Sequence, residues 1–217
     1  MHKHPDFKNL HIVSHPLVQH KLSRMRDETC PTGEFRRLLR EISYLLGYEV
    51  TYNLPMTTET IRTPMQKMTA PVLGGPLPVV VPILRAGLGM AEGLIELIPD
   101  CYIGHIGLYR DEETHKPVEY LVKLPTAIDG LKFIVTDPML ATGNSSEYAF
   151  DVLVRHGVKP ENIILMCLVA APEGVRTLER RYGMVAVFTA SLDEKLNDTA
   201  YIVPGLGDAG DRLFGTL

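Results

Sequence analysis

The segment 134–146 holds an acid, a glycine and several hydroxyl residues in an order typical of a phosphate site. It reads Ile-Val-Thr-Asp-Pro-Met-Leu-Ala-Thr-Gly-Asn-Ser-Ser, and a helical pattern follows it. A loop between a strand and a helix directs free backbone N–H groups and the positive end of the helix dipole towards one point. Thr142, Ser145 and Ser146 add hydroxyl donors, and Gly143 lets a bulky phosphate approach the main chain. We therefore predict an anion site in this loop.

Asp137 lies in the same segment, although a carboxylate repels a phosphate group of like charge. The acid fits only if it accepts hydrogen bonds from another part of the same ligand. A sugar diol has the required donors. The whole segment is therefore interpreted as a cradle for a sugar phosphate.

A second strand–turn–helix pattern places an arginine in the turn. The segment 82–90 reads Pro-Ile-Leu-Arg-Ala-Gly-Leu-Gly-Met, and Arg85 follows an apolar run. Its planar guanidinium group suits the oxygens of a phosphate or diphosphate, although a tight turn with a solvated arginine gives the same pattern. Arg110 opens the polar segment 110–116, which suits an exposed hairpin or a lid. This arginine either brings a second cation to the ligand or remains in solvent.

The segment 201–212 combines three glycines with a proline near the end of the chain. It reads Tyr-Ile-Val-Pro-Gly-Leu-Gly-Asp-Ala-Gly-Asp-Arg, so its backbone path is restricted. Such a loop suits reading the edge of a flat ligand with main-chain N–H and C=O groups. A Gly-rich tail is the alternative, but apolar residues at 201–203 and 213–214 would anchor both ends.

Apolar runs and amphipathic patterns alternate after the first fifty residues, which we predict to be helical, with a helix ending at Gly47. The apolar runs are 78–84, 101–109, 131–136 and 162–170, and the helical patterns are 88–98, 146–156 and 172–182. This alternation is typical of an α/β fold with a largely parallel sheet flanked by helices. Ligands bind at the carboxyl edge of such a sheet, where the phosphate and arginine motifs are expected to meet.

Length and composition bound the class of protein. The 217 residues suit one domain, 1–217, and 22 basic against 26 acidic residues give a net charge of −4, which argues against nucleic-acid binding. The three cysteines lack the spacing of a disulfide framework or a zinc site. No signal peptide or membrane-spanning run is found, so we expect a cytoplasmic protein with no membrane partner.

Two other ligand classes are considered. The segment 205–210 matches the dinucleotide fingerprint Gly-x-Gly-x-x-Gly, but the seven residues left cannot supply the required helix and βαβ unit, and 87–93 is only a near match. Histidines at positions 2, 4, 11, 15 and 20 would suit a zinc site, although a solvated N-terminus explains them better.

Three segments in the same order resemble one family. Asp-Pro-Met-Leu-Ala-Thr-Gly-Asn-Ser at 137–145 resembles the phosphoribosyl-diphosphate signature of the type I phosphoribosyltransferases, in the form found in uracil phosphoribosyltransferases. The segments 82–90 and 204–212 resemble the same family, and the likeness runs from about residue 10 to the C-terminus. It implies a type I phosphoribosyltransferase-like α/β fold with a small hood and an N-terminal helical segment.

The resemblance also implies a reaction and partners. The 5-phosphoribosyl group would pass from 5-phosphoribosyl-1-diphosphate to uracil, giving UMP and diphosphate, with Mg²⁺ as cofactor and pyrimidine salvage as the role. A homodimer or higher homo-oligomer is implied, with the N-terminal helices as an interface. Some members respond to GTP, and the sequence leaves open whether this one binds GTP as an activator.

Site residues are carried over by position. Catalytic roles fall to Asp137, Arg110 and Asp208, and Mg²⁺ is expected mainly on the diphosphate, with Asp208 as the candidate protein ligand. The residues assigned to the phosphoribosyl donor are Arg85, Arg110, Asp137, Pro138, Met139, Leu140, Ala141, Thr142, Gly143, Asn144, Ser145 and Asp208. The residues assigned to uracil are Ile202, Gly207, Asp208 and Ala209.

Three positions refine the assignment. Asp137-Pro138 replaces the two adjacent acids of the wider superfamily, which favours the uracil enzymes. Asn144 stands where a second glycine is expected, and because asparagine tolerates positive φ we expect a modest effect on phosphate binding. Ala141 stands where enzymes for 6-oxopurines have an acid, which disfavours that substrate class. The remaining alternatives are an enzyme for another base and a non-catalytic regulator that binds RNA.

Overall fold

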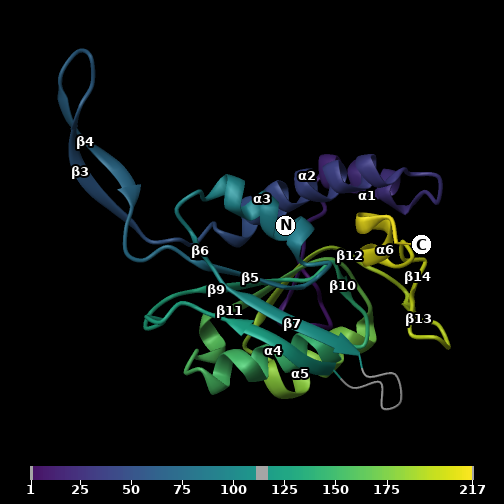
Figure 1. The fold of residues 1–217 in the computed structure, drawn as a ribbon. Helices are drawn as coiled ribbons and strands as arrows, with labels where there is room; N and C mark the ends of the chain where they lie inside the picture. The colour runs from purple at the N-terminus through teal and green to yellow at the C-terminus, as the bar shows by residue number, and fades with distance from the viewer. Residues whose placement is uncertain (1, 111–116, 217) are drawn as a thin grey trace.

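The computed structural model describes residues 2–110 and 117–216, and a mostly parallel sheet runs through its centre (Figure 1). Its strand order is β1-β2-β12-β11-β9-β5-β7-β8, with β10 beside β11 and β6 beside β5. All neighbours are parallel except β1–β2 and β7–β8 at the two edges. The strands of this sheet are β1 (His2–Lys3), β2 (Leu10–Ile12), β5 (Val79–Leu84), β6 (Tyr102–Ile103), β7 (His105–Arg110), β8 (Pro117–Lys123), β9 (Phe133–Thr136), β10 (Met139–Leu140), β11 (Ile163–Ala170) and β12 (Ala186–Leu192).

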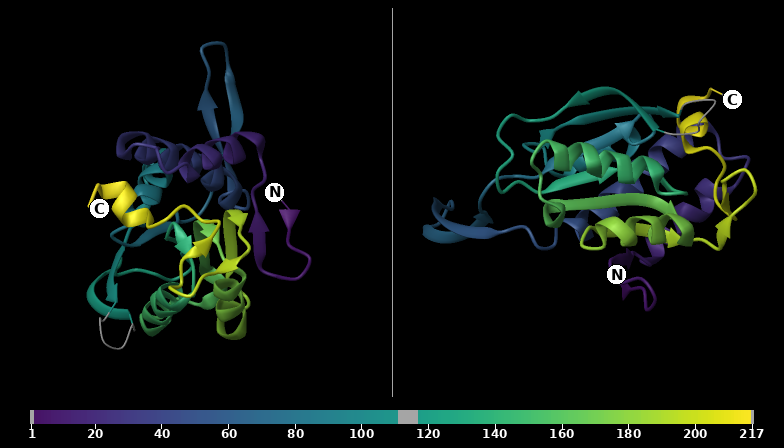
Figure 2. Two further views of the ribbon diagram at one scale, coloured as in Figure 1. Left: turned by 90° about the vertical axis from the view of Figure 1, so that its right-hand side faces the viewer. Right: turned by 90° about the horizontal axis from the view of Figure 1, so that it is seen from below.

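Helices cover both faces of the sheet, as Figures 1 and 2 show. One layer consists of α1 (Pro16–Arg26), α2 (Thr32–Val50), α3 (Leu88–Leu97) and α6 (Ala209–Phe214), and the other of α4 (Asn144–Arg155) and α5 (Pro172–Tyr182). The short 3-10 turn η1 (Pro160–Asn162) precedes β11. The core is accordingly divided in two: Val80 packs with the first layer, whereas its neighbours Val79 and Val81 pack with the second. This alternation explains why central strands read as continuous apolar runs.

The predicted strands and helices are present with small shifts in their ends. The run 101–109 divides into β6 and β7, and the helix predicted at 146–156 begins earlier, at Asn144. The predicted exposed hairpin has its two arms, because β7 and β8 pair antiparallel up to Arg110 opposite Pro117. Residues 111–116, the predicted lid, lie outside the described residues, as does the side chain of Arg110.

The prediction for the first fifty residues is wrong at two points. Residues 2–3 and 10–12 form strands, and β2 extends the sheet by pairing parallel with β12. The second error concerns Gly47, which does not end α2, since the helix continues to Val50. A Cβ atom at Gly47 would lie 2.7 Å from Leu94 Cδ2, so this glycine lets α2 and α3 approach closely.

Five further strands were not located from the sequence. β12 lies in the sheet between β11 and β2, and β3 (Met56–Arg62) pairs with β4 (Lys67–Leu73). The short pair β13 (Lys195–Leu196) and β14 (Ile202–Val203) forms the hood near the C-terminus; the resemblance implied a hood but not its residues. The hairpin β3–β4 projects from the body of the protein (Figure 1) and carries exposed apolar side chains, Met65 among them. Within the part of the chain that the structure describes, no helix is long and apolar enough to cross a membrane.

Candidate active site

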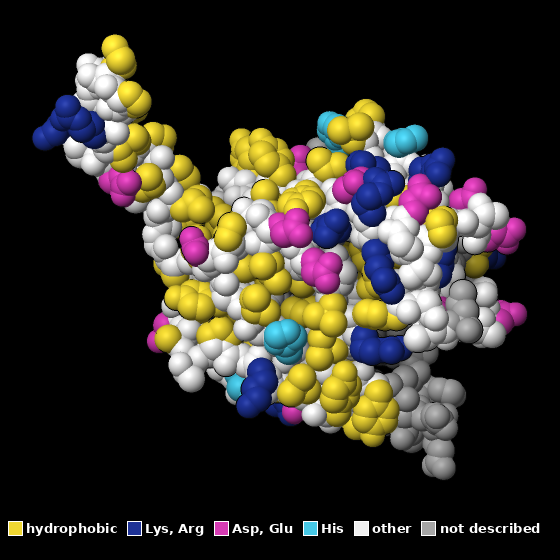
Figure 3. All heavy atoms as spheres, turned by 45° about the horizontal axis from the view of Figure 1, so that its top comes forward, with side chains coloured by type: hydrophobic (Ala, Val, Ile, Leu, Met, Phe, Trp, Pro, Cys, Tyr) yellow, Lys and Arg dark blue, Asp and Glu magenta, His cyan; other side chains and the backbone are white. Residues whose placement is uncertain are grey.

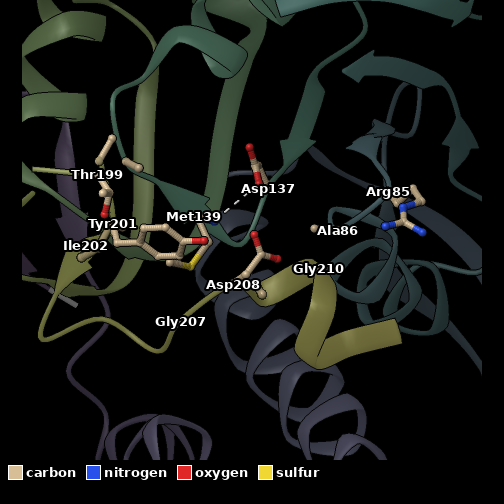
Figure 4. A pocket seen from close by; sticks show the side chains of 13 residues that line it. Arg85, Ala86, Asp137, Met139, Thr199, Tyr201, Ile202, Gly207, Asp208 and Gly210 are labelled. Atoms are coloured by element: carbon tan, nitrogen blue, oxygen red, sulfur yellow. Dashed lines mark hydrogen bonds between the residues drawn. The ribbon is translucent and has the colours of Figure 1, made fainter. Parts of the chain in front are cut away.

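A cavity of about 370 Å³ opens where the predicted motifs meet (Figure 4). The loop after β9, the turn after β5 and the C-terminal loop line it. The predicted site residues among its lining are Arg85, Asp137, Met139, Ala141, Ile202, Gly207, Asp208 and Ala209. Segments more than a hundred positions apart in the sequence therefore share one pocket at the carboxyl edge of the sheet, as expected for this fold class.

The predicted phosphate loop forms the start of α4. Gly143 precedes the helix with φ 86°, a left-handed conformation that glycine adopts without strain. The helix then begins at Asn144, whose N–H lies 3.4 Å from the Thr142 hydroxyl oxygen. Free N–H groups of the first helical turn and the helix dipole favour an anion here. The sequence-based interpretation of this loop thus has the expected local geometry.

Several details of the loop differ from the sequence-based expectations. Asn144 lies inside the helix, so Gly143 alone has the positive φ, and the tolerance of asparagine for that conformation is not needed. Ser146 is buried, with 2% of its surface exposed, and does not present its hydroxyl to a ligand. Of the predicted residues at 138–145, only Met139 and Ala141 line the cavity; Thr142, Gly143, Asn144 and Ser145 follow Ala141 in the chain but are not part of the lining, and Pro138 and Leu140 are buried.

The loop is held from behind by α5. A Cβ atom on Gly174 would lie 2.4 Å from the Ala141 carbonyl oxygen, and a Cβ atom on Gly143 would lie 2.9 Å from the Gly174 carbonyl oxygen. The two glycines therefore let two backbone segments touch directly. Met139 and Leu140 also pair with Val169 and Ala170 of β11, which fixes the loop on the sheet. A loop fixed in this way holds its N–H groups in place before a ligand binds.

Asp137 is half-buried, and its carboxyl group has an unusual pKa. Burial raises the pKa of this carboxyl to about 7, against the effect of the Met139 N–H, which donates to the carboxylate at 3.4 Å. The negative charge of Asp208 adds to the rise. Figure 4 places both acids on the cavity. A perturbed acid in a cavity is typical of a functional site.

Arg85 follows a cis peptide bond with Leu84 and is exposed. Its guanidinium carbon lies 5.2 Å from the centre of the Phe214 ring in α6, a cation–π arrangement. Figure 4 shows the side chain on the far side of Ala86 from Asp137. Arg85 lines the cavity as predicted, but its side chain rests on α6 and would need to turn to meet a diphosphate beside Asp137.

The C-terminal loop presents its backbone to the cavity. A cis bond joins Val203 to Pro204, and Gly207 has φ 77°. Asp208 caps α6, since its side chain accepts a hydrogen bond from the Asp211 N–H at 2.9 Å. This bond occupies one carboxylate oxygen of Asp208, Oδ1, and fixes the orientation of the carboxylate group. Together with buried Ile202 and Ala209, the loop forms one wall of the cavity.

Sequence reasoning missed several lining residues, namely Ala86, Thr199, Ala200, Tyr201 and Gly210. The turn between β13 and β14 carries Thr199, Ala200 and Tyr201 on the cavity, with Tyr201 beside Met139 (Figure 4). Asn197 shapes this turn, because its side-chain oxygen accepts hydrogen bonds from the Thr199 and Tyr201 N–H groups. The Asn-Asp pair at 197–198 is the turn signal by which the sequence could have located this segment.

The cavity contains acids but no ready-made metal centre. Among the described residues, no group of three or more His, Cys, Asp or Glu side chains is placed to hold a metal ion. Asp137 and Asp208 both reach the cavity. Such a pair suits an ion that arrives with a phosphate ligand, since Mg²⁺ usually takes one or two carboxylates and completes its coordination with phosphate oxygens and water.

Comparison with known proteins assigns the family. The family model of uracil phosphoribosyltransferase matches residues 12–216. The chain belongs to the uracil phosphoribosyltransferase family. It is 62% identical over 216 residues to the uracil phosphoribosyltransferase of Rhodospirillum centenum, with 100% of both chains covered. It is 56% identical to that of Ralstonia pickettii, with 100% of this chain and 99% of the relative covered.

The fold has a solved counterpart too. The AQ2163 protein from Aquifex aeolicus is similar with a TM-score of 0.87 and 35% identity, covering 94% of this chain and 97% of that one. The resemblance inferred from the three motifs is thus confirmed, as is the α/β fold of the type I phosphoribosyltransferase kind.

Proposed function

We propose that this member of the uracil phosphoribosyltransferase family transfers the 5-phosphoribosyl group from 5-phosphoribosyl-1-diphosphate to uracil, giving UMP and diphosphate in pyrimidine salvage. One observation supports the proposal above others: a single cavity holds Asp137, Ala141 at the phosphate loop and the backbone of Gly207. A phosphoribosyl ligand needs a phosphate site, a diol acceptor and a base site within one molecule's length. Ala141, Asp137 and Gly207 mark the parts of the cavity that we propose for the phosphate, the diol and the base.

The donor would bind with its 5-phosphate at the start of α4, where segment 141–145 offers backbone N–H and hydroxyl groups. Asp137 would then accept hydrogen bonds from the ribose hydroxyls. Because its pKa is about 7, the acid is only partly ionised near neutral pH. Two hydroxyl donors stabilise the carboxylate, so donor binding would favour its charged form.

Displacement at the anomeric carbon develops oxocarbenium-like charge, as in glycoside chemistry. The protein must therefore orient the donor and the base, stabilise the departing diphosphate and exclude water. Arg85, and Arg110 at the end of β7, are the cations proposed for the diphosphate. No covalent nucleophile is needed. Asp137, beside the ribose, would also stabilise the positive charge that develops on the sugar.

Mg²⁺ is the cofactor that this reaction would use. Hard carboxylate oxygens of the kind that Asp208 brings to the cavity fit the ion, as do diphosphate oxygens. When bound, Mg²⁺ would neutralise charge on the diphosphate and so improve it as a leaving group. Asp208 Oδ2, the carboxylate oxygen that does not cap α6, is the protein group proposed to contact the ion or the donor.

Uracil would lie against the C-terminal loop. Backbone groups of Gly207 and Ala209 read the edge of a base without a charged side chain, which suits a neutral pyrimidine. Ile202 supplies an apolar wall, since it is buried and lines the cavity. Ala141 lines the cavity where enzymes for 6-oxopurines have an acid, and its side chain has no carboxyl group, which agrees with a pyrimidine as the base.

Several wider properties remain proposals. We infer one domain over 1–217, because the strands of the ten-stranded sheet come from both ends of the chain, β1 to β12. A cytoplasmic location is proposed as well, and GTP is kept as a candidate activator, since some members of the family respond to it. A homo-oligomer is also proposed. The sequence leads us to expect the N-terminal helices as an interface. The projecting hairpin β3–β4 also carries apolar side chains along its surface (Figure 3). Met65 of this hairpin is 90% exposed. Such a surface favours pairing with a second copy.

Formation of UMP by the purified protein tests the function. Uracil, 5-phosphoribosyl-1-diphosphate and Mg²⁺ are supplied, with cytosine, orotate, adenine and hypoxanthine in parallel reactions. Turnover with uracil alone is expected. Turnover with a different base would overturn the base assignment. No product with any base, in the presence and absence of GTP, would favour the RNA-binding regulator, and a gel shift would then detect RNA binding.

A further inference from the structure

An ion pair outside the cavity connects α1 to the loop assigned to the base. The Arg26 guanidinium donates to both carboxylate oxygens of Asp193, at 2.6 and 2.7 Å. The Asp193 side chain is 2% exposed and that of Arg26 is 23% exposed. Exposed ion pairs contribute little to stability, but a two-point pair with a buried acid fixes both partners in position.

Both partners also hold the backbone of Gly205. Arg26 donates to the Gly205 carbonyl oxygen at 2.7 Å, and the Gly205 N–H donates to Asp193 Oδ2 at 2.9 Å. Gly205 is buried, has φ 60° and touches Ile202, since a Cβ atom would lie 2.1 Å from the Ile202 carbonyl oxygen. Every polar backbone group of this residue is therefore tied to the ion pair.

Asp193 is itself fastened to the sheet. Its N–H donates to the Ala170 carbonyl oxygen at 2.8 Å, and its Oδ1 accepts from the Ser191 hydroxyl at 2.7 Å. Hydrogen bonds from Arg26, Ser191 and Gly205 offset burial and hold the pKa of the Asp193 carboxyl below its usual range. The carboxylate is thus a rigid anchor at the end of β12.

The end of α1 holds the next residue of the loop as well. Arg212 donates to the Leu206 carbonyl oxygen at 2.9 Å and to the Asp27 carbonyl oxygen at 2.6 Å. Arg26 directly, and Asp27 through Arg212, therefore hold the loop immediately before Gly207, where it enters the cavity. The phosphate loop is held differently, by α5 and β11.

We propose that Arg26 and Asp193 are positioning residues for base recognition. Their ion pair sets the backbone path of Gly205 and Leu206, and so the direction in which the backbone groups of Gly207 face the base. The inference rests on the proposed function, because it takes the loop to be the uracil site. Loss of the pair would displace base contacts and leave the 5-phosphate contacts in place. A shift of about 1 Å in a positioned group is enough to cost up to about a hundredfold in rate.

Steady-state kinetics of Arg26→Gln and Arg26→Lys test the inference, with KM measured separately for each substrate. Arg26→Gln is expected to raise the uracil KM about tenfold or more and the donor KM less than about threefold. Arg26→Lys keeps the charge but loses the two-point geometry, so it should fall between wild type and Arg26→Gln. If Arg26→Gln does not fold, Arg26→Lys alone decides through the same KM split.

Arg24→Gln is the matched control. Arg24 lies on the same helix and pairs with Glu34 at 2.9 Å, but its side chain is 60% exposed and does not line the cavity. Both KM values of this variant should equal those of wild type. An unchanged uracil KM in the folded Arg26 variants, or an equal rise in both KM values, would overturn the positioning role. If the wild type forms no UMP from uracil, the proposed function fails instead.

Discussion

The hydroxyl of Thr136 donates a hydrogen bond to the Gly87 carbonyl oxygen at 3.0 Å, in a buried contact between the end of β9 and the turn after β5. The contact is close, because a Cβ atom on Gly87 would lie 2.2 Å from the Thr136 carbonyl oxygen. Thr136 directly precedes Asp137, and Gly87 closes the turn that carries Arg85. The acid proposed for the ribose and the cation proposed for the diphosphate thus share one support.

Thr136→Val should weaken this support. The substitution keeps the shape and removes one hydrogen bond to a carbonyl that also accepts from α3, so we expect a loss of about 1 kcal/mol in stability. Because both donor-binding turns shift, the KM for the donor should rise. Ser43→Ala removes a buried hydrogen bond inside α2, to Leu39, and serves as control. Ser43→Ala should lower the melting temperature and leave the donor KM at its wild-type value. If the two variants have the same donor KM, Thr136 does not support the donor site.

Asp137→Asn should lower kcat at least about tenfold. The amide keeps the size of the side chain but loses the negative charge that would accept from the ribose hydroxyls and face the developing sugar cation. Initial rates of UMP formation at saturating substrates measure the effect. A variant with wild-type turnover would remove Asp137 from the mechanism.

The pH dependence of activity should report the same acid. Because the pKa of the Asp137 carboxyl is about 7, kcat/KM for the donor should fall as the pH drops through that value and the carboxylate becomes protonated. In Asp137→Asn the residual kcat/KM should not show this fall towards low pH. A wild-type profile that is flat from pH 6 to about 8 would contradict the raised pKa.

Stability should depend on pH in the opposite sense. Asp137 has a higher pKa when folded, about 7, than its ordinary value of 3.8, so its favourable contribution is present below that ordinary value and is lost as the pH rises through about 7. At pH 8, Asp137→Asn should therefore have a higher melting temperature than wild type, with a free energy of unfolding larger by roughly 1–2 kcal/mol. This difference in free energy should be smaller at pH 5. Thermal melts of the unliganded proteins measure it. A difference that does not change with pH would argue against a buried acid.

Gly143→Ala should damage the phosphate loop. The residue has φ 86°, and an added Cβ atom would meet the Gly174 carbonyl oxygen at 2.9 Å, so the helix start must shift at a cost of about 1–2 kcal/mol. The donor KM should rise several-fold and the uracil KM little. Gly33→Ala in α2 is the control, since an added Cβ there meets nothing within 4 Å. Identical donor KM values in the two variants would exclude the loop from phosphate binding.

Local patterns predicted the site better than they predicted its surroundings. The phosphate loop was recognisable because a strand, a glycine and a helix follow one another within one short segment. Arg26 was not, because on α1 it looks like any solvated helix residue, and its partner Asp193 lies 167 positions away. Contacts of this kind depend on the tertiary fold, which no local pattern contains.

The missed strands have physical reasons of their own. β12 carries Thr189 in its centre, which interrupts the apolar run, yet its hydroxyl is satisfied by the Leu168 carbonyl oxygen at 3.2 Å. Most side chains of the hairpin β3–β4 are exposed, and β3 has no apolar alternation. In β4, Met68, Ala70 and Val72 do alternate with other residues, but Pro71 within the run argues against a strand. The β2 run is only three residues long, too short for its period to be read.

A crystal structure with bound UMP would test the central claim most directly, since UMP contains the phosphate, the ribose and the base. The account predicts the phosphate at the start of α4, the ribose hydroxyls on Asp137 and the uracil edge against the backbone of Gly207 and Ala209. A nucleotide with its phosphate away from α4, or with its base away from the C-terminal loop, would contradict it.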